Sequence, residues 1–164
     1  MIELHGQSLG LREIADDDID FLKKVYFSVR EDEMKQVGHW TDEMKNAFLT
    51  QQFNAQHTHY QQNYTEAKYW VIEIEKQGIG RLYYDESGDK VCIIDIALLP
   101  EYRSKGLGEG ILKSIFERAK AIEKNVEIHV ETFNPAMRLY LRLGFKKVSE
   151  TNGVYHLLEW NYKQ

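Results

Sequence analysis

Cysteine is almost absent from this chain of 164 residues, since Cys92 is the only one. A single thiol cannot form an intrachain disulfide, so we expect a protein of a reducing, cytoplasmic environment. No apolar run approaches the roughly 20 residues of a membrane-spanning helix. The first ten residues also lack the basic and apolar regions of a signal peptide. We therefore expect no membrane partner.

Basic residues are also scarce relative to acidic ones, 21 against 26, which gives a formal net charge of -5. This balance argues against nucleic acid or an anionic membrane as the main partner, and an acidic surface suits a cationic acceptor. The apolar content of 43% and charged content of 29% are typical of a globular chain. Length and composition predict a single domain over residues 1–164.

The spacing of apolar residues predicts an α+β protein with a mixed sheet. We expect a polar connection at 30–39, a hairpin turn at 76–78, and strands at 8–14, 68–74, 79–84, 91–99, 126–132, 145–150 and 154–162. The strand at 91–99 is a continuous apolar run except for Asp95, so we expect it to be buried on both faces. Helices are expected after Asp16-Asp17-Asp18, from the N-cap Thr41 to about residue 64, and over 107–122.

A glycine-rich turn joins the apolar strand at 91–99 to the amphipathic helix at 107–122. It reads RSKGLG from Arg103 to Gly108. Glycine lets the backbone approach a ligand closely, and the first amides of a helix lack intrahelical partners and favour negative charge. The turn therefore predicts a phosphate or pyrophosphate site. Its spacing fits neither the GxxxxGK[ST] phosphate loop nor the GxGxxG dinucleotide fingerprint.

This RxxGxG turn, after a strand closed by Pro100, resembles the acetyl-CoA loop of the GNAT family of N-acetyltransferases. A second segment, NPAMRLYLRLGF at 134–145, resembles the other signature of that family. The resemblance covers roughly residues 68 to 160. It implies the GNAT (acyl-CoA N-acyltransferase) fold, with a mostly antiparallel sheet of six to seven strands and about four flanking helices. In that fold the sheet splays between strands four and five, where the cofactor enters.

The resemblance implies an enzyme that transfers an acetyl group from acetyl-CoA directly to a primary amine of a small molecule, peptide or protein. The alternative is a non-catalytic acyl-CoA-binding sensor or assembly module with the same fold. A longer acyl donor stays open, no metal is expected, and family members are often homodimers. The segment departs from the family pattern because Asn134 lies six residues before Tyr140 instead of seven. Asn134 therefore either contacts the cofactor or only caps a helix.

The resemblance also implies roles for single residues. The turn would hold the pyrophosphate, and the bulged end of strand four, at Ile96-Ala97-Leu98, would polarise the acetyl carbonyl and pair with the pantetheine arm. Tyr140 would protonate or hydrogen-bond the departing sulfur, unless it is only a core tyrosine. The implied cofactor-binding residues are Ile96, Ala97, Leu98, Arg103, Ser104, Lys105, Gly106, Leu107, Gly108, Glu109, Asn134 and Tyr140.

Three residues are candidates for the general base, with Glu131 and His129 ranked together and Asp95 after them. His129, Glu131 and Phe133 share one face of their strand by its period of two. Each candidate is equally compatible with a structural role, and a chain of water molecules is a further alternative. Cys92 lies within an apolar run, so we expect an inert core thiol.

Residues 56–60 form a cluster of Gln, His and Tyr near the end of the second predicted helix. His57 and His59 point about 200° apart on a helix, so they do not converge on a zinc ion. The cluster either lines an acceptor pocket or forms a solvated helix face.

Overall fold

The structure is a computed structural model that describes residues 2–4, 7–132 and 134–164. The described residues form one eight-stranded sheet in the order β1-β2-β3-β4-β5-β6-β8-β7. Neighbouring strands are antiparallel, except that β5 and β6 are parallel. The strands are β1 (Ile2–Leu4), β2 (Gln7–Glu13), β3 (Lys68–Ile74), β4 (Gln77–Asp85), β5 (Val91–Leu98), β6 (Val126–Glu131), β7 (Lys146–Thr151) and β8 (Tyr155–Trp160).

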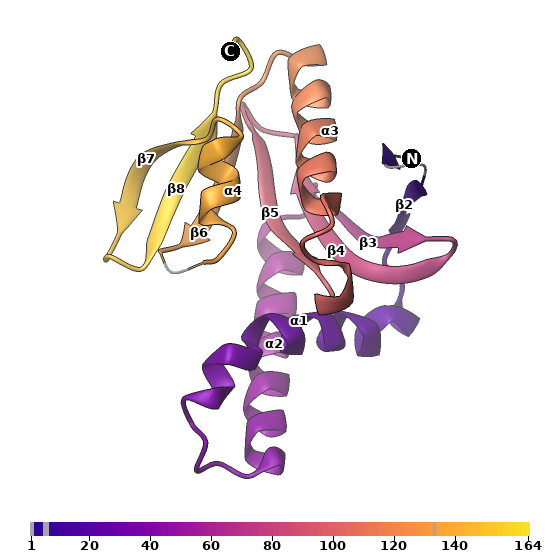
Figure 1. Ribbon diagram of the computed structural model, residues 1–164, viewed down its shortest axis with the longest axis vertical. Coiled ribbons are helices and arrows are strands. Elements are labelled where there is room, and N and C mark those ends of the chain that lie inside the picture. The colour runs from indigo at the N-terminus through magenta and orange to yellow at the C-terminus, as the bar shows by residue number, and fades with distance from the viewer. Residues whose placement is uncertain (1, 5–6, 133) are drawn as a thin grey trace.

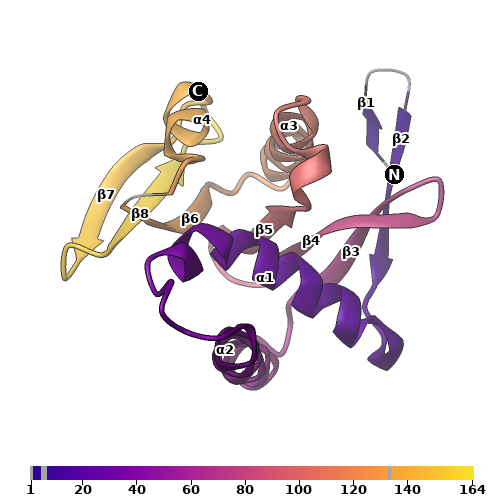
Figure 2. The same ribbon diagram turned by 60° about the horizontal axis from the view of Figure 1, so that its bottom comes forward.

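Four α-helices of the described chain cover the sheet: α1 (Ile19–Lys35), α2 (Asp42–Asn63), α3 (Leu107–Ala121) and α4 (Met137–Arg142). Figures 1 and 2 show α1 and α2 on one face and α3 and α4 on the other. Each face has its own core. The larger core, with Ile111 and Phe116, lies under α3, and the smaller core packs Leu22 and Phe53 against Val71 of β3.

The predicted α+β architecture with a mixed sheet is confirmed, with one strand more than expected because Ile2–Leu4 pairs with β2. The expected polar connection at 30–39 is wrong for residues 30–35, where α1 continues to Lys35, and is confirmed for residues 36–39, which lie between α1 and α2. Ion pairs one turn apart support this extension, from Arg30 to Glu33 at 2.8 Å and from Lys35 to Asp32 at 3.3 Å.

Two predicted turns can be compared with the structure. The N-cap at the start of α2 is confirmed, because the Thr41 hydroxyl accepts a hydrogen bond from the Met44 amide at 3.1 Å. The β3–β4 turn lies slightly earlier than 76–78. Glu75 and Lys76 adopt φ angles of 50° and 68°, and β4 already begins at Gln77.

The parallel strands β5 and β6 pair over only three residues, from Val91 opposite Val126 to Ile93 opposite Ile128. β5 then continues to Leu98 without pairing with any described strand on that side. A bulge marks the point of divergence, because Tyr84 pairs with Ile93 and Tyr83 with Asp95. This opening is the predicted splay, because β5 and β6 are the fourth and fifth of the strands expected from the sequence. The bulge lies at residue 94, which is earlier than the predicted 96–98.

The expectation that β5 is buried on both faces is wrong for its second half. Residues 94–98 are each partly exposed, whereas Val91 and Ile93 are buried. The cause is the missing neighbour, because β6 diverges after Ile128 and leaves this edge of β5 uncovered. A ligand could therefore reach the edge of β5 inside the sheet.

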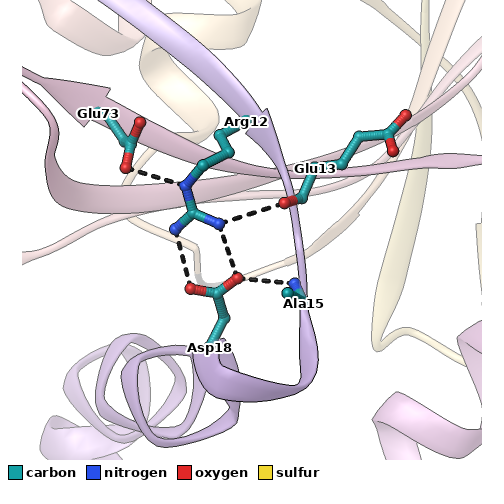
Figure 3. Close-up of polar contacts among 5 residues, drawn as sticks. All are labelled: Arg12, Glu13, Ala15, Asp18 and Glu73. Carbon is teal, nitrogen blue, oxygen red and sulfur yellow. Dashed lines mark hydrogen bonds and ion pairs between the residues drawn. The ribbon is translucent and has the colours of Figure 1, made fainter.

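Arg12 of β2 fastens the start of the first helix (Figure 3). Its guanidinium donates to both carboxylate oxygens of Asp18, at 2.9 and 2.8 Å, and to Glu73 at 3.0 Å. Asp18 also accepts from the Ala15 amide at 2.7 Å. The Arg12 hydrogen bonds hold the pKa of Asp18 below its usual value. This geometry agrees with the prediction that the aspartates at 16–18 begin the first helix.

Glu86 ties the turn between β4 and β5 to α3. Its carboxylate accepts hydrogen bonds from Arg118 at 3.0 and 2.7 Å and from the Tyr84 hydroxyl at 2.5 Å. These contacts, led by the Arg118 hydrogen bonds, lower the pKa of Glu86 to about 2. The side chain therefore stays ionised in the folded protein well below its ordinary pKa of 4.5.

We expect Glu86→Gln to reduce stability by about 1 kcal/mol at pH 7, a small value because solvent screens the half-exposed Arg118. A carboxyl group with a lowered folded pKa stabilises the fold above its unfolded pKa of 4.5, and this contribution is lost as pH falls toward about 2. Urea unfolding between pH 7 and pH 2 should therefore show a shallower acid decline for Glu86→Gln. Glu117→Gln is the control, and equal declines in the two variants would contradict the assignment.

Candidate functional site

The turn between β5 and α3 follows the end of β5 that lies at the opening. Ser104 and Gly106 adopt left-handed φ angles of 59° and 79°. The Gly110 amide bonds to the Gly106 carbonyl at 3.1 Å, so the three amides at 107–109 are left without intrahelical partners. A Cβ atom on Gly108 would meet nothing within 4 Å. The start of α3 thus presents free amides and empty space, which suits an anionic group.

Arg103 anchors this turn to the rest of the protein. Its Nε donates to the Leu98 carbonyl at 2.9 Å and its terminal nitrogen to the Ser28 hydroxyl of α1 at 3.2 Å. Lys105 is exposed and forms no ion pair with the described residues. Glu109 pairs with Arg142 of α4 at 2.5 Å. Of the two cationic side chains in the turn, Arg103 is held by protein groups, so Lys105 is the one available to bind a phosphate.

The edge of β5 supplies free backbone groups to the opening. The Leu99 amide bonds to Ile79 of β4 at 2.8 Å. Because successive residues of a strand direct their backbone groups to opposite sides, Ala97 also faces β4, whereas Ile96 and Leu98 face the opening. The Leu98 carbonyl is already used by Arg103. The Ile96 amide and carbonyl and the Leu98 amide are left for a ligand.

Tyr140 of α4 is buried, with 5% of its surface exposed, and packs edge-on against Phe145 at 5.7 Å. Burial raises the pKa of Tyr140, and the negative charge of Asp95 raises it further. The Tyr140 hydroxyl makes no hydrogen bond with any described residue. Tyr140 thus packs in the core while its polar end is left without a protein partner.

Asn134 precedes α4 and holds its first turn. Its side-chain oxygen accepts from the Ala136 amide at 2.8 Å, and its backbone carbonyl accepts from Met137 at 3.0 Å. This contact is a turn that leads into α4, whose N-cap residue is Ala136, so the helix cap expected at Asn134 lies two residues later. A contact from Asn134 to the cofactor stays a prediction.

The three base candidates occupy different surroundings. Asp95 is paired with Arg81 at 2.7 Å. Glu131 is partly buried on β6, and it lies close enough to Arg30 of α1 for its negative charge to affect the pKa of that arginine. His129 is exposed and lines a separate hollow of about 430 Å³. His129 and Glu131 share a face as predicted, and Phe133 lies outside the described residues.

The cluster at 56–60 mostly faces the sheet. Gln56 bonds to Arg81 at 3.0 Å, His57 stacks on Phe53 at 5.6 Å, and Tyr60 packs edge-on against Tyr83 at 5.8 Å. The alternative of a solvated face therefore holds for His59 but not for these three. Whether they line an acceptor pocket stays a prediction.

Arg81 is the main residue that our sequence analysis missed. It is a single charge in an otherwise apolar strand, and Asp95 is a single charge in the next strand. Two opposite charges in adjacent apolar strands are a signal for a buried pair.

Cys92 is partly buried, and burial raises the pKa of its thiol to about 12. Such a thiol is protonated at neutral pH, in agreement with the prediction that it is inert. Within the described ranges, no three His, Cys, Asp or Glu side chains gather to hold a metal ion. In the same part of the chain, every helix is too short or too polar to cross a membrane.

Comparison with known proteins identifies the family. The family model "Acetyltransferase (GNAT) domain" matches residues 65–147, half of the chain. An N-alpha-acetyltransferase from Sulfurisphaera tokodaii is 28% identical over 105 residues, covering 55% of this chain and 63% of the relative. One from Saccharolobus solfataricus is 39% identical over 67 residues, covering 38% and 40%. Each alignment thus spans less than two thirds of the relative.

The fold comparison agrees with the sequence comparison. The crystal structure of PaiA N-acetyltransferase from Thermoplasma acidophilum in complex with coenzyme A superposes with a TM-score of 0.69. The match covers 94% of this chain and 99% of that one at 18% identity, which supports a common fold. Together with the family model, these likenesses show that the chain belongs to the GNAT acetyltransferase family.

Proposed function

We propose that this protein is an N-acetyltransferase that transfers an acetyl group from acetyl-CoA directly to a primary amine. The observation that carries the proposal is the combination of three features, of which the first two lie at one opening of the sheet. These features are the free amides at the start of α3, the unpaired edge of β5, and the unpartnered Tyr140 hydroxyl.

Each feature suits one part of acetyl-CoA. The amides at 107–109, with Lys105 nearby, would hold the pyrophosphate at the positive end of the α3 dipole. Ile96 and Leu98 would pair with the amide groups of the pantetheine arm as an added strand does. This arrangement would place the thioester between β5 and β6, next to Tyr140 and Asp95.

The reaction needs a neutral amine nitrogen and a stabilised leaving group. An ammonium group first gives a proton to a base, and the nitrogen then attacks the thioester carbon. A C–N bond forms, the C–S bond breaks, and the proton that the attacking nitrogen then loses goes to the departing thiolate, so that coenzyme A leaves as its thiol. A backbone amide of β5 would polarise the carbonyl oxygen, and the Tyr140 hydroxyl would donate a hydrogen bond to the departing sulfur.

The proposal is tested by calorimetry with acetyl-CoA, followed by thiol release with a panel of amines. Peptides with free N-termini belong in the panel because two relatives are named N-alpha-acetyltransferases. We expect acetyl-CoA binding and thiol release with at least one amine. Binding without release from any amine or protein N-terminus would favour the non-catalytic acyl-CoA-binding module. Failure to bind would overturn both functions.

We expect Glu131→Gln or His129→Ala to move the acidic limb of the pH–rate profile, because a base must be deprotonated to accept the amine proton. Profiles of kcat/KM for the two variants and the wild type measure this. Glu127→Gln is the control, because Glu127 shares that face of β6 but lies where β6 still pairs with β5, away from the opening. Unchanged limbs in both variants would assign the proton to Asp95 or to water.

A further inference from the structure

Arg81 is the most deeply buried charged residue among those described, with 3% of its surface exposed. One terminal nitrogen donates to Asp95 Oδ2 at 2.7 Å and to Gln56 Oε1 of α2 at 3.0 Å. Its guanidinium also lies over the rings of Tyr83 at 5.0 Å and Tyr26 of α1 at 5.8 Å. Contacts from α1, α2 and β5 therefore fix this side chain in one place.

Stability alone does not account for this pair. Removing two charges from water is costly, and replacing a buried ion pair by apolar side chains is often neutral or stabilising. The smaller core around the pair is otherwise built from aromatic and aliphatic groups such as Leu22, Leu49 and Phe53. A charged pair in such surroundings calls for a role beyond holding the fold.

Asp95 is the member of the pair that lies at the opening. It directly follows the bulge at residue 94, beyond the last residue of β5 that pairs with β6. Its Oδ2 is taken by Arg81, and its Oδ1 accepts no hydrogen bond from the described residues. The side chain keeps 17% of its surface exposed, and its charge acts on Tyr140. One oxygen is thus held inside the protein, while the other has no hydrogen-bond partner among the described residues.

We propose that Arg81 is a positioning residue that holds one oxygen of Asp95, so that the other oxygen binds the nitrogen of the acceptor amine beside the thioester. This inference rests on the proposed acetyl transfer and adds its amine-binding group. An incoming ammonium carries N–H donors and a positive charge, and an unpaired carboxylate oxygen satisfies both. The Arg81 nitrogen that holds Asp95 also donates to Gln56, and a lysine ammonium would not reproduce this planar, ring-stacked arrangement.

The test is a double-mutant cycle of Arg81→Lys and Asp95→Asn, with kcat and KM measured for the best amine. Asp95→Asn keeps an oxygen for Arg81 but presents an NH₂ group to the amine, so we expect kcat/KM to fall about 100-fold, mainly through KM. Arg81→Lys keeps the charge and loses the planar guanidinium with its contacts to Gln56 and the Tyr83 ring, for an expected fall of about 10-fold. Acetyl-CoA affinity should stay within about twofold in both, as for groups that do not touch it.

The double variant should be no worse than Asp95→Asn, because Arg81 acts through Asp95. Arg12→Lys is the matched control, since Arg12 forms an Arg–Asp pair of 2.8 Å with Asp18 at the start of the first helix (Figure 3). It should leave kcat/KM unchanged, as befits a pair that only supports the fold.

The outcomes separate this inference from the proposed function. An inactive wild type would overturn both. An active wild type whose two substitutions are additive, or an Asp95→Asn variant with unchanged KM, would overturn only the role of the pair. If thermal melting shows that Arg81→Lys is unfolded, the effect of Asp95→Asn on KM still decides the test.

Discussion

Gly108→Glu should lose at least about 100-fold in acetyl-CoA affinity, which corresponds to nearly 3 kcal/mol of binding free energy. The side chain would fill the space beside the free amides at 107–109 and place a negative charge where the pyrophosphate is expected. The fold should persist, because a Cβ at this position meets nothing within 4 Å and glycine is a poor helix former. Calorimetry with acetyl-CoA and thermal melting measure the two effects.

Gly88→Glu is the matched control for this prediction. Gly88 lies in the turn between β4 and β5, and a Cβ there also meets nothing within 4 Å. The same substitution adds the same charge at a different site, so we expect unchanged affinity. Gly108→Ala adds only a methyl group and separates bulk from charge. Full acetyl-CoA affinity in Gly108→Glu would remove the turn from the binding site.

Most elements of the fold could be predicted because their local signals are strong. The strand at 68–74 matches β3 at both ends, and the predicted helix at 107–122 matches α3 within one residue. The Thr41 cap was predictable because the hydroxyl and the amide that it bonds are three residues apart in the sequence. Signals of this kind do not depend on the rest of the chain.

The errors in the predicted fold share a cause, which is that they depend on distant partners. The second half of β5 is as apolar as the first, but only contact with β6 decides whether it is buried. The extension of α1 to Lys35 likewise runs through a polar segment that composition alone assigns to a connection. Its ion pairs are local, but Met34 near its end also packs against the smaller core, and this contact with distant residues is not visible in the sequence pattern.

The same distinction applies to the site. The turn from Arg103 to Gly108 could be predicted because its glycines and the following helix are adjacent in the chain. The pair of Arg81 and Asp95 could not be placed, because its two residues lie on different strands and its role depends on the opening beside them. A general base could not be chosen for the same reason. The candidates lie on β5 and β6, which are distant in sequence and are brought together only by the fold.

Tyr140→Phe should lower kcat about 100-fold while leaving the acetyl-CoA affinity nearly unchanged, a loss typical of removing one donor to a developing negative charge. Burial raises the pKa of Tyr140 above its usual value near 10, and the Asp95 charge adds to the effect. A thiol, with a pKa near 8.5, is then a stronger acid than this phenol. Tyr140 should therefore stabilise the departing sulfur by a hydrogen bond and keep its own proton.

The sign of this pKa shift gives a second measurement on the same variant. A raised pKa means that the hydroxyl stays protonated until well above pH 10, so Tyr140 contributes no alkaline limb below that value. Tyr140→Phe should lower the pH–rate profile without changing its shape. Tyr84→Phe is the control, because its hydroxyl bonds to Glu86 away from the opening and should affect stability instead. A lost alkaline limb in Tyr140→Phe would instead show that Tyr140 transfers its proton during the reaction.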